Sequence, residues 1–420
     1  MPRLRRSLTT RGMAFAGCGA VLVAAGVLLG QRDLTRVGIL LLALTVIGVL
    51  LVARHGLRLD VSRSASPARV AIGERAVVTV RVTNAEASVS PVLMAEESLD
   101  YALGDRPRFV FPSLRPGESQ EIQYTVRSHS RGVHRLGPLG VRVRDPFGLS
   151  LRTSAVSGEG EVVVLPRVFP LPTGRSLGSG IGSEGSVPHM VALHGEDDQT
   201  VREYRDGDDL RRIHWPATAR TGEMMVRQED RPAKRRAVVL LDSSRAGHAG
   251  TGRSSSFEWC VSATASVVAH LVGLRYAVHL LTPDPGSDLG SHHDDVLEDC
   301  LDRLARVSTG SPESLRSVLH AASGLTAQGG LLVYVGGAPT DDDVRTLAAL
   351  RQPGSAGVAM IVDDQAFGGR TARGAPAAGR AGAAASALGA SGWISTIITP
   401  RSTVVEAWSA VVGAQAAGAR

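Results

Sequence analysis

Two long apolar runs lie near the start of the chain, at residues 13–30 and 37–53, and neither contains a charged residue. An α-helix rises about 1.5 Å per residue, so each run is just long enough to cross a hydrocarbon core of roughly 30 Å. The polar gap between them is short, which predicts a tight transmembrane hairpin over residues 13–53. Four arginines precede the first run and Arg54, Arg58 and Arg63 follow the second, whereas the gap has only two arginines beside Asp33. This predicts a multi-pass cell-membrane protein with both termini and all soluble domains in the cytoplasm.

Between residues 57 and 155, apolar and polar residues alternate with a period of two in several short segments. This is the period of β-strands with one buried face. Turn-forming pairs such as Pro-Gly and Gly-Asp separate the segments, which predicts an antiparallel β-sandwich of immunoglobulin-like type. In the turn at residues 145–149, we expect Asp145 to cap the turn, Phe147 to fill the core and Gly148 to adopt a positive φ.

Residues 236–415 alternate short apolar runs with segments of helical periodicity. We expect strands at 237–241, 276–281, 331–335, 357–362 and 393–398, and helices at 257–273, 294–307, 312–323, 340–350 and 403–412. This order predicts an α/β domain with a mostly parallel sheet and helices on both faces. Residues 365–390 are rich in Ala, Gly and Arg and poor in large apolar side chains, which predicts a disordered insert in a surface loop.

The connecting region, residues 156–235, contains a motif of dense mixed charge at residues 201–227. Charges of both signs beside an aromatic residue predict a segment held by ion pairs and anchored on a neighbouring surface by Trp215. Two interpretations stay open, a clamp between the β-rich and α/β parts and a binding site for a partner. The motif residues are Arg202, Glu203, Tyr204, Gly207, Asp208, Asp209, Arg211, Trp215 and Arg220.

The net charge of +6 is concentrated at the apolar end of the chain. Nine arginines and two aspartates up to Arg63 give +7, which leaves −1 for the remainder. A body of this charge gives no support for nucleic-acid binding. The three cysteines are widely spaced, which favours buried or membrane-embedded thiols over a zinc site or a disulfide.

The motif resembles the signature of a bacterial family called domain of unknown function 58. The surroundings agree with this family, because two apolar runs, a β-rich part with an Asp-Pro-Phe-Gly-Leu turn and a strand followed by Asp-x-Ser occur in that order. The resemblance implies a von Willebrand A-like, Rossmann-like fold for residues 236–415. Members of the family are generally encoded near MoxR-type AAA+ ATPases and transglutaminase-like membrane proteins, which implies partners of these kinds.

In von Willebrand A domains, a metal ion is held by Asp-x-Ser-x-Ser after the first strand, a later Thr and a later Asp. Asp242 and Ser244 match this pattern and Ser311 resembles the Thr, but Ala246 replaces the last Ser. Gly336 begins the loop where the second Asp would stand. Because Mg²⁺ needs around six oxygen ligands, we interpret Asp242, Ser244 and Ser311 as a degenerate metal site and expect no cofactor, with bound Mg²⁺ as the alternative.

Two functions of different classes follow from these patterns. The first is a non-enzymatic, membrane-tethered interaction or assembly protein that works with a MoxR-type ATPase in cell-envelope assembly. The alternative is a divalent-metal-dependent hydrolase or transferase that uses Asp242 and Asp363 at the carboxyl ends of the strands. We favour the first, because the sequence contains no recognisable pairing of a nucleophile with a base.

Overall fold

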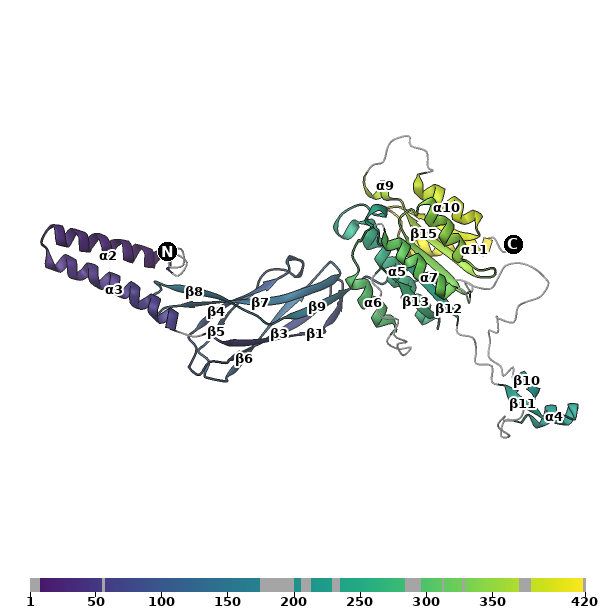
Figure 1. Ribbon diagram of the computed structural model, residues 1–420, viewed down its shortest axis with the longest axis horizontal. Helices are drawn as coiled ribbons and strands as arrows, with labels where there is room; N and C mark the ends of the chain where they lie inside the picture. The colour runs from purple at the N-terminus through teal and green to yellow at the C-terminus, as the bar shows by residue number, and fades with distance from the viewer. Residues whose placement is uncertain are drawn as a thin grey trace. The chain divides into compact units, whose positions relative to one another are not determined.

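The chain folds into two compact units, Met1–Pro166 and Arg167–Arg420 (Figure 1). The structure is a computed structural model, and each unit is described below by itself. It describes residues 8–54, 57–173, 200–204, 213–228, 235–283, 296–311, 313–326, 329–369 and 379–417.

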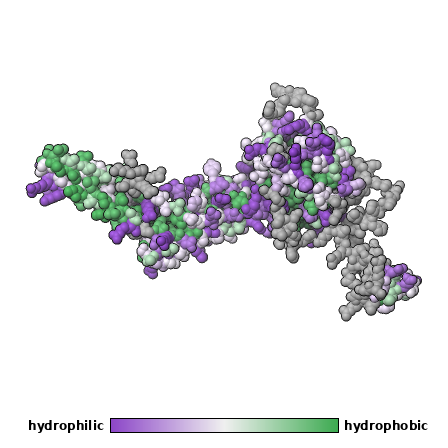
Figure 2. All heavy atoms as spheres, viewed as in Figure 1, coloured by the Kyte–Doolittle hydropathy of each residue, from purple (hydrophilic) through white to green (hydrophobic). Residues whose placement is uncertain are grey.

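A helical hairpin opens the first unit, with α2 over Thr10–Leu28 and α3 over Arg32–Arg54. Glycines let the two helices approach closely, since a Cβ added at Gly38 would lie 2.7 Å from the backbone nitrogen of Val23. The link is shorter than the expected gap at 31–36, because Arg32 already begins α3. By length and composition both helices could cross a membrane, and apolar residues cover them in Figure 2.

A β-sandwich completes the first unit. Its elements are β1 (Leu59–Ser66), β2 (Arg69–Ala71), β3 (Arg75–Asn84), β4 (Leu93–Leu99), the 3-10 helix η1 (Tyr101–Leu103), β5 (Arg108–Phe111), β6 (Ser119–Arg127), β7 (Gly132–Arg144), β8 (Leu151–Val156) and β9 (Gly160–Leu165). One sheet has the order β1-β3-β6 and the other β2-β9-β7-β4-β5, with β8 beside β7. Alternate residues of both sheets fill one shared core, as the period of two predicts.

The sandwich differs from the expected one in two respects. Strand β9 lies beyond the expected boundary at residue 155, and it pairs with β2 in parallel rather than antiparallel fashion. A buried ion pair also joins the two sheets. The Arg63 Nε atom donates to Glu97 Oε1 at 2.7 Å, and neither side chain is exposed to solvent.

The second unit contains a five-stranded parallel sheet of order β13-β12-β14-β15-β16. Its strands are β12 (Arg236–Leu241), β13 (Ala277–Leu281), β14 (Leu331–Gly336), β15 (Ala356–Val362) and β16 (Trp393–Ile398). Its helices are η3 (Arg245–Gly247), η4 (Gly252–Ser254), α5 (Ser256–Gly273), α6 (Val296–Arg306), α7 (Glu313–Thr326), α8 (Asp341–Leu350), α9 (Asp364–Phe367), α10 (Arg380–Ala390) and α11 (Val404–Ala417). Buried residues of α5, α6 and α11 pack on one face, and those of α7, α8 and α10 pack on the other.

The expectation of a disordered insert at residues 365–390 is wrong for its two ends. Residues 364–367 form α9, and residues 380–390 form α10, in which Leu388 is fully buried. Alanine has the highest helix propensity, and its small side chain lets α10 pack closely on the sheet. Residues 370–378 lie outside the described residues.

Candidate functional site

The strongest candidate region of the α/β unit is the carboxyl edge of its sheet between β12 and β14. Strand β12 lies between β13 and β14, and the helices that follow β12 and β14, α5 and α8, cover opposite faces. Ligands of open α/β sheets bind outside the strand ends at such a reversal of strand order. Asp242, the residue directly after β12, lies at this point and is 2% exposed.

The Asp242 carboxylate holds the loop that follows β12. Its Oδ1 atom accepts a hydrogen bond from the backbone nitrogen of Ser244 at 2.8 Å. The hydroxyl of Tyr334, from β14, interacts with the Asp242 carboxylate and donates to the Gly337 carbonyl at 2.7 Å. Burial raises the pKa of Tyr334 well above its ordinary value and the Asp242 charge raises it further, so Tyr334 remains a hydrogen-bond donor.

Two glycines after β14 pack closely against Asp242 and the loop that follows it. A Cβ added at Gly336 would lie 2.3 Å from the Cβ of Asp242, and one added at Gly337 would lie 2.4 Å from the Gly247 carbonyl. The loop after β14 therefore has no room for a side chain where a metal-binding aspartate would be needed.

Backbone pairing brings the loop before α7 to the same edge. Ser244 forms a parallel bridge with Gly310, and the backbone nitrogen of Gly310 donates to the Ser243 carbonyl at 2.8 Å. This pairing places Ser311 on an open pocket next to the loop after β12. The residues that line this pocket are Arg245, Ala246, Thr309, Gly310 and Ser311.

The three predicted metal ligands therefore lie in one region but do not fit a magnesium site. Asp242 supplies a single carboxylate, which is buried and bonded to its own loop. Among the described residues, no group of three or more His, Cys, Asp or Glu side chains could hold a metal ion. Mg²⁺ prefers several carboxylate and water oxygens in an octahedral shell, so we assign Asp242 and Ser244 to loop structure.

His248 is a further member of this region that the sequence did not single out. Its Nε2 atom donates to the Asp242 carbonyl at 2.9 Å, and its Nδ1 atom lies 3.2 Å from the Ser256 hydroxyl. The ring thus fastens the loop after β12 to the first residue of α5. No spacing rule links a histidine to a serine eight positions later in an irregular loop, so folding alone reveals this contact.

Asp363 does not converge with Asp242. It follows β15, and β14 lies between β12 and β15, so the two strand ends are about 10 Å apart. The Asp363 Oδ1 atom accepts from the backbone nitrogens of Gln365 at 3.1 Å and Ala366 at 3.3 Å. This carboxylate caps α9, which accounts for its position after the strand.

The charged motif forms a small β-α-β element, with β10 over Thr200–Glu203, α4 over Trp215–Thr221 and β11 over Met225–Gln228. Strands β10 and β11 pair antiparallel, so that Arg202 and Glu203 lie opposite Val226 and Met225. The backbone nitrogen of Tyr204 donates to the Met224 carbonyl at 2.8 Å. Gly207, Asp208, Asp209 and Arg211 lie outside the described residues, so the predicted ion pairs and the domain clamp stay predictions.

Trp215 does not contribute to the core of this element, and its predicted anchoring on a neighbouring surface stays a prediction. Trp215 is 68% exposed at the first position of α4. Arg220, near the end of the same helix, is exposed as well. Among the residues of the element whose burial the structure describes, Ile213 and Val226 are buried apolar side chains, and they form a β-bridge with each other. The local fold is already held by backbone pairing and by the His214 ring, whose Nδ1 atom accepts from the Ala217 nitrogen at 3.1 Å.

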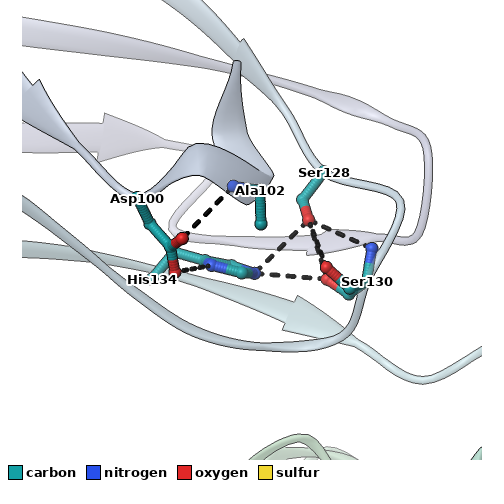
Figure 3. Close-up of polar contacts among 5 residues, drawn as sticks. All are labelled: Asp100, Ala102, Ser128, Ser130 and His134. Carbon is teal, nitrogen blue, oxygen red and sulfur yellow. Dashed lines mark hydrogen bonds and ion pairs between the residues drawn. The ribbon is translucent and has the colours of Figure 1, made fainter. Parts of the chain in front are cut away.

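The β-sandwich contains an Asp–His–Ser group, with His134 and Ser128 buried and Asp100 half exposed, that the sequence did not reveal (Figure 3). His134, from β7, places Nδ1 3.0 Å from Asp100 Oδ2 and Nε2 3.3 Å from the Ser128 hydroxyl. The Ser128 hydroxyl in turn donates to the Ser130 carbonyl at 2.8 Å. A nucleophilic serine must reach its substrate, whereas Ser128 is 1% exposed, so we assign a structural role to this group.

Solved structures that resemble the chain cover about a quarter of it. The CARDB domain of a Pyrococcus furiosus protein is 18% identical, with a TM-score of 0.19, and the match covers 25% of this chain and 93% of that domain. The ApaA protein from Bordetella pertussis is 15% identical, with a TM-score of 0.20, and the match covers 26% of this chain and 94% of that one.

Sequence comparison points to the charged motif and the start of the α/β unit. The chain is 26% identical over 175 residues to the uncharacterized protein YeaD of Bacillus subtilis, a match that covers 41% of each protein. The chain thus matches less than half the length of this relative. The protein family of unknown function DUF58 matches residues 200–281, from the first residue of β10 to the last residue of β13.

Proposed function

We propose that this protein is a non-enzymatic, membrane-tethered interaction protein, and that the β10–α4–β11 element binds a partner protein through Trp215. The exposure of Trp215 carries this proposal. A tryptophan that is 68% exposed on a short, well-capped helix presents a large rigid apolar surface to solvent. Tryptophan and arginine are the residues most enriched in the energetic centres of protein interfaces, and Arg220 is exposed on the same helix.

The partner that we propose is a MoxR-type AAA+ ATPase, with a transglutaminase-like membrane protein as a further component of the same assembly. The resemblance to domain of unknown function 58 supports this choice, and the match at residues 200–281 includes the whole β10–α4–β11 element. The process served would be the assembly of cell-envelope or membrane complexes.

The rest of the chain fits a tethered protein. In our proposal α2 and α3 span the cell membrane as a hairpin, with both termini in the cytoplasm. The sandwich is then an immunoglobulin-like spacer, and the parallel sheet is a von Willebrand A-like domain without a functional metal site. Strand β12 followed by Asp242 and Ser244 supports the von Willebrand A-like assignment.

Binding of a purified MoxR-type ATPase, encoded in the same genome, to the full chain in detergent tests the proposal. We expect Trp215→Ala to weaken this binding by roughly tenfold or more. Tyr101→Ala is the matched control, since Tyr101 is an aromatic residue that is 96% exposed in the sandwich. Equal affinity of wild type and Trp215→Ala, with unchanged circular dichroism, would exclude this element as the docking site.

A further inference from the structure

The turn at residues 145–150, hereafter the 145–150 turn, joins the sandwich to both helices of the hairpin. The Ser150 hydroxyl donates to the Gly48 carbonyl of α3 at 2.8 Å. On the α2 side, the backbone nitrogen of Thr9 donates to the Leu149 carbonyl at 2.9 Å, and the Thr9 hydroxyl donates to the Gly148 carbonyl at 2.7 Å. The turn is therefore held at the end of the hairpin where α2 begins and α3 ends.

Two helix glycines make room for this contact. A Cβ added at Gly12 would lie 2.0 Å from the Leu149 carbonyl oxygen, and one added at Gly48 would lie 3.0 Å from Asp145 Oδ2. Leu149 itself is 2% exposed. Hydrogen bonds to main-chain carbonyls and close packing thus fix the height of the turn along the hairpin.

That height lies at the outer edge of the hydrocarbon core of a bilayer. Gly48 lies six residues before Arg54, the last residue of α3, so the turn contacts α3 about 9 Å from the helix end. Helix α3 has 23 residues and is about 34 Å long, slightly more than a hydrocarbon core of roughly 30 Å. With α3 centred on that core, Gly48 lies about 7 Å inside the hydrocarbon, whereas Thr9 immediately precedes the 19-residue α2 and lies at the boundary. The turn therefore spans the outer part of the hydrocarbon and the lipid headgroup boundary.

Phe147 is the residue that the turn leaves exposed at this height. It is 50% exposed, although the sequence predicts that it fills the core. The Asp145 carboxylate fixes the tip by accepting from the backbone nitrogens of Phe147 at 3.1 Å and Ser150 at 2.5 Å. An exposed aromatic ring on a rigid tip, next to two apolar helices, has the chemistry of a residue that enters the membrane interface.

The charges nearby fit lipid headgroups. Arg11 and Arg54, on the two helices, and Arg144, directly before the turn, are all exposed. Arginine side chains at this depth extend toward lipid phosphates while their apolar stems stay against the helices. Asp145 is the acidic residue of the turn, and it is 5% exposed and committed to the backbone bonds above.

We propose that the 145–150 turn is a bilayer-contact site, in which Phe147 inserts into the lipid headgroup region and Arg11, Arg54 and Arg144 bind headgroup phosphates. This inference rests on the proposed transmembrane hairpin, and it adds a lipid-binding surface on the soluble sandwich. In this proposal the contact holds the sandwich in one fixed orientation relative to the membrane.

Fluorescence quenching in vesicles of equal parts phosphatidylcholine and phosphatidylglycerol tests this site. The full chain is reconstituted as wild type, Phe147→Trp, Tyr101→Trp and Leu40→Trp, and the signal of the four native tryptophans is subtracted. Tyr101 is the matched control, because it is 96% exposed near His134, at the opposite end of β7. Leu40, 65% exposed in the middle of α3, reports on the hairpin itself.

A nitroxide placed next to the headgroup should reduce the added fluorescence of Phe147→Trp by roughly half and leave Tyr101→Trp unchanged. A nitroxide deep in the acyl chain should quench Leu40→Trp. If Leu40→Trp is quenched and Phe147→Trp behaves like Tyr101→Trp, the lipid contact is wrong while the hairpin stands. If Leu40→Trp is not quenched, the hairpin and the lipid contact both fail.

Discussion

At the scale of single residues, Asp242 shows how a pattern typical of metal binding can serve structure. Its carboxylate accepts a hydrogen bond from the backbone nitrogen of Ser244, so its loss would leave this buried donor without its acceptor. We expect Asp242→Ala to lower the free energy of unfolding of the α/β unit by about 1–3 kcal/mol. Asp341→Ala, at an exposed acid of the same unit, should change it by less than about 0.5 kcal/mol.

Thermal melting of the same proteins also tests the metal site. Mg²⁺ and Mn²⁺ should leave the Tm of wild type and of Asp242→Ala unchanged, because one buried carboxylate cannot complete a divalent-ion shell. A rise in the Tm of wild type that is absent from Asp242→Ala would restore the metal hypothesis, since bound ligand stabilises the folded state.

The ion pair between Arg63 and Glu97 is the second residue-scale case. Both side chains are buried, and the pair joins strands of different sheets. Glu97→Gln preserves shape but leaves the Arg63 charge uncompensated, so we expect a loss of about 3–5 kcal/mol in the free energy of unfolding of the sandwich. Glu121→Gln, which removes an exposed partner of Arg81, should cost less than about 1 kcal/mol in denaturant titrations. Similar losses of unfolding free energy for both variants would contradict the conclusion that the buried Arg63–Glu97 ion pair stabilises the sandwich.

At the scale of elements, the His134 group connects three separate parts of the sandwich. Asp100 precedes η1, Ser128 follows β6, and His134 lies in β7. The hydrogen bond from His134 and one from the backbone nitrogen of Ala102 hold the pKa of Asp100 below its ordinary value. A carboxyl with a lowered pKa in the folded state stabilises the protein above its unfolded pKa, and this stabilisation is lost as pH falls.

A pH series follows from this sign. The stability of the sandwich should decline as pH falls below about 4, and Asp100→Asn should flatten that decline. Asp100 is half exposed, so solvent screens the effect and it should be small. Asp105→Asn, at an exposed acid in the next loop, should retain the wild-type decline. The same loss of stability at low pH in wild type and Asp100→Asn would show that Asp100 does not contribute to the pH dependence.

Elements with a clear periodicity of apolar and polar residues could be predicted from the sequence, whereas elements that depend on tertiary packing could not. The strands and helices of the α/β unit follow from alternating apolar runs, and the expected capping box of α8 is present between Thr340 and Asp343. Helix α10 was missed because its Ala-rich composition resembles disorder, although Leu388 and two buried alanines fix it on the sheet.

The same distinction between local patterns and tertiary contacts applies to the candidate site residues. Turn chemistry correctly gave the cap by Asp145 and the positive φ of Gly148, because both depend on local backbone geometry. The turn that carries Phe147 is bonded to Gly48 of α3, about a hundred residues away in the sequence, and a local pattern cannot contain such a contact. Likewise, Asp100 and His134 are 34 positions apart, and only the pairing of strands brings them together.

At the scale of the whole molecule, the two units have separate hydrophobic cores. In the described part of the chain, the buried cluster of the sandwich contains residues from 61 to 164, and the two clusters on the faces of the parallel sheet contain residues from 171 to 411. All four tryptophans lie in the second unit. Tryptophan fluorescence therefore reports on the second unit alone, whereas circular dichroism reports on both.

Unfolding in denaturant should accordingly show two transitions, because each core is lost independently. Glu97→Gln should shift the circular dichroism transition that has no fluorescence counterpart, and Asp242→Ala should shift the one that tryptophan fluorescence follows. Each variant is the control for the other, since each removes a buried carboxylate from one unit. One coincident transition that both variants move equally would show instead that the sandwich and the α/β unit fold as a single cooperative body.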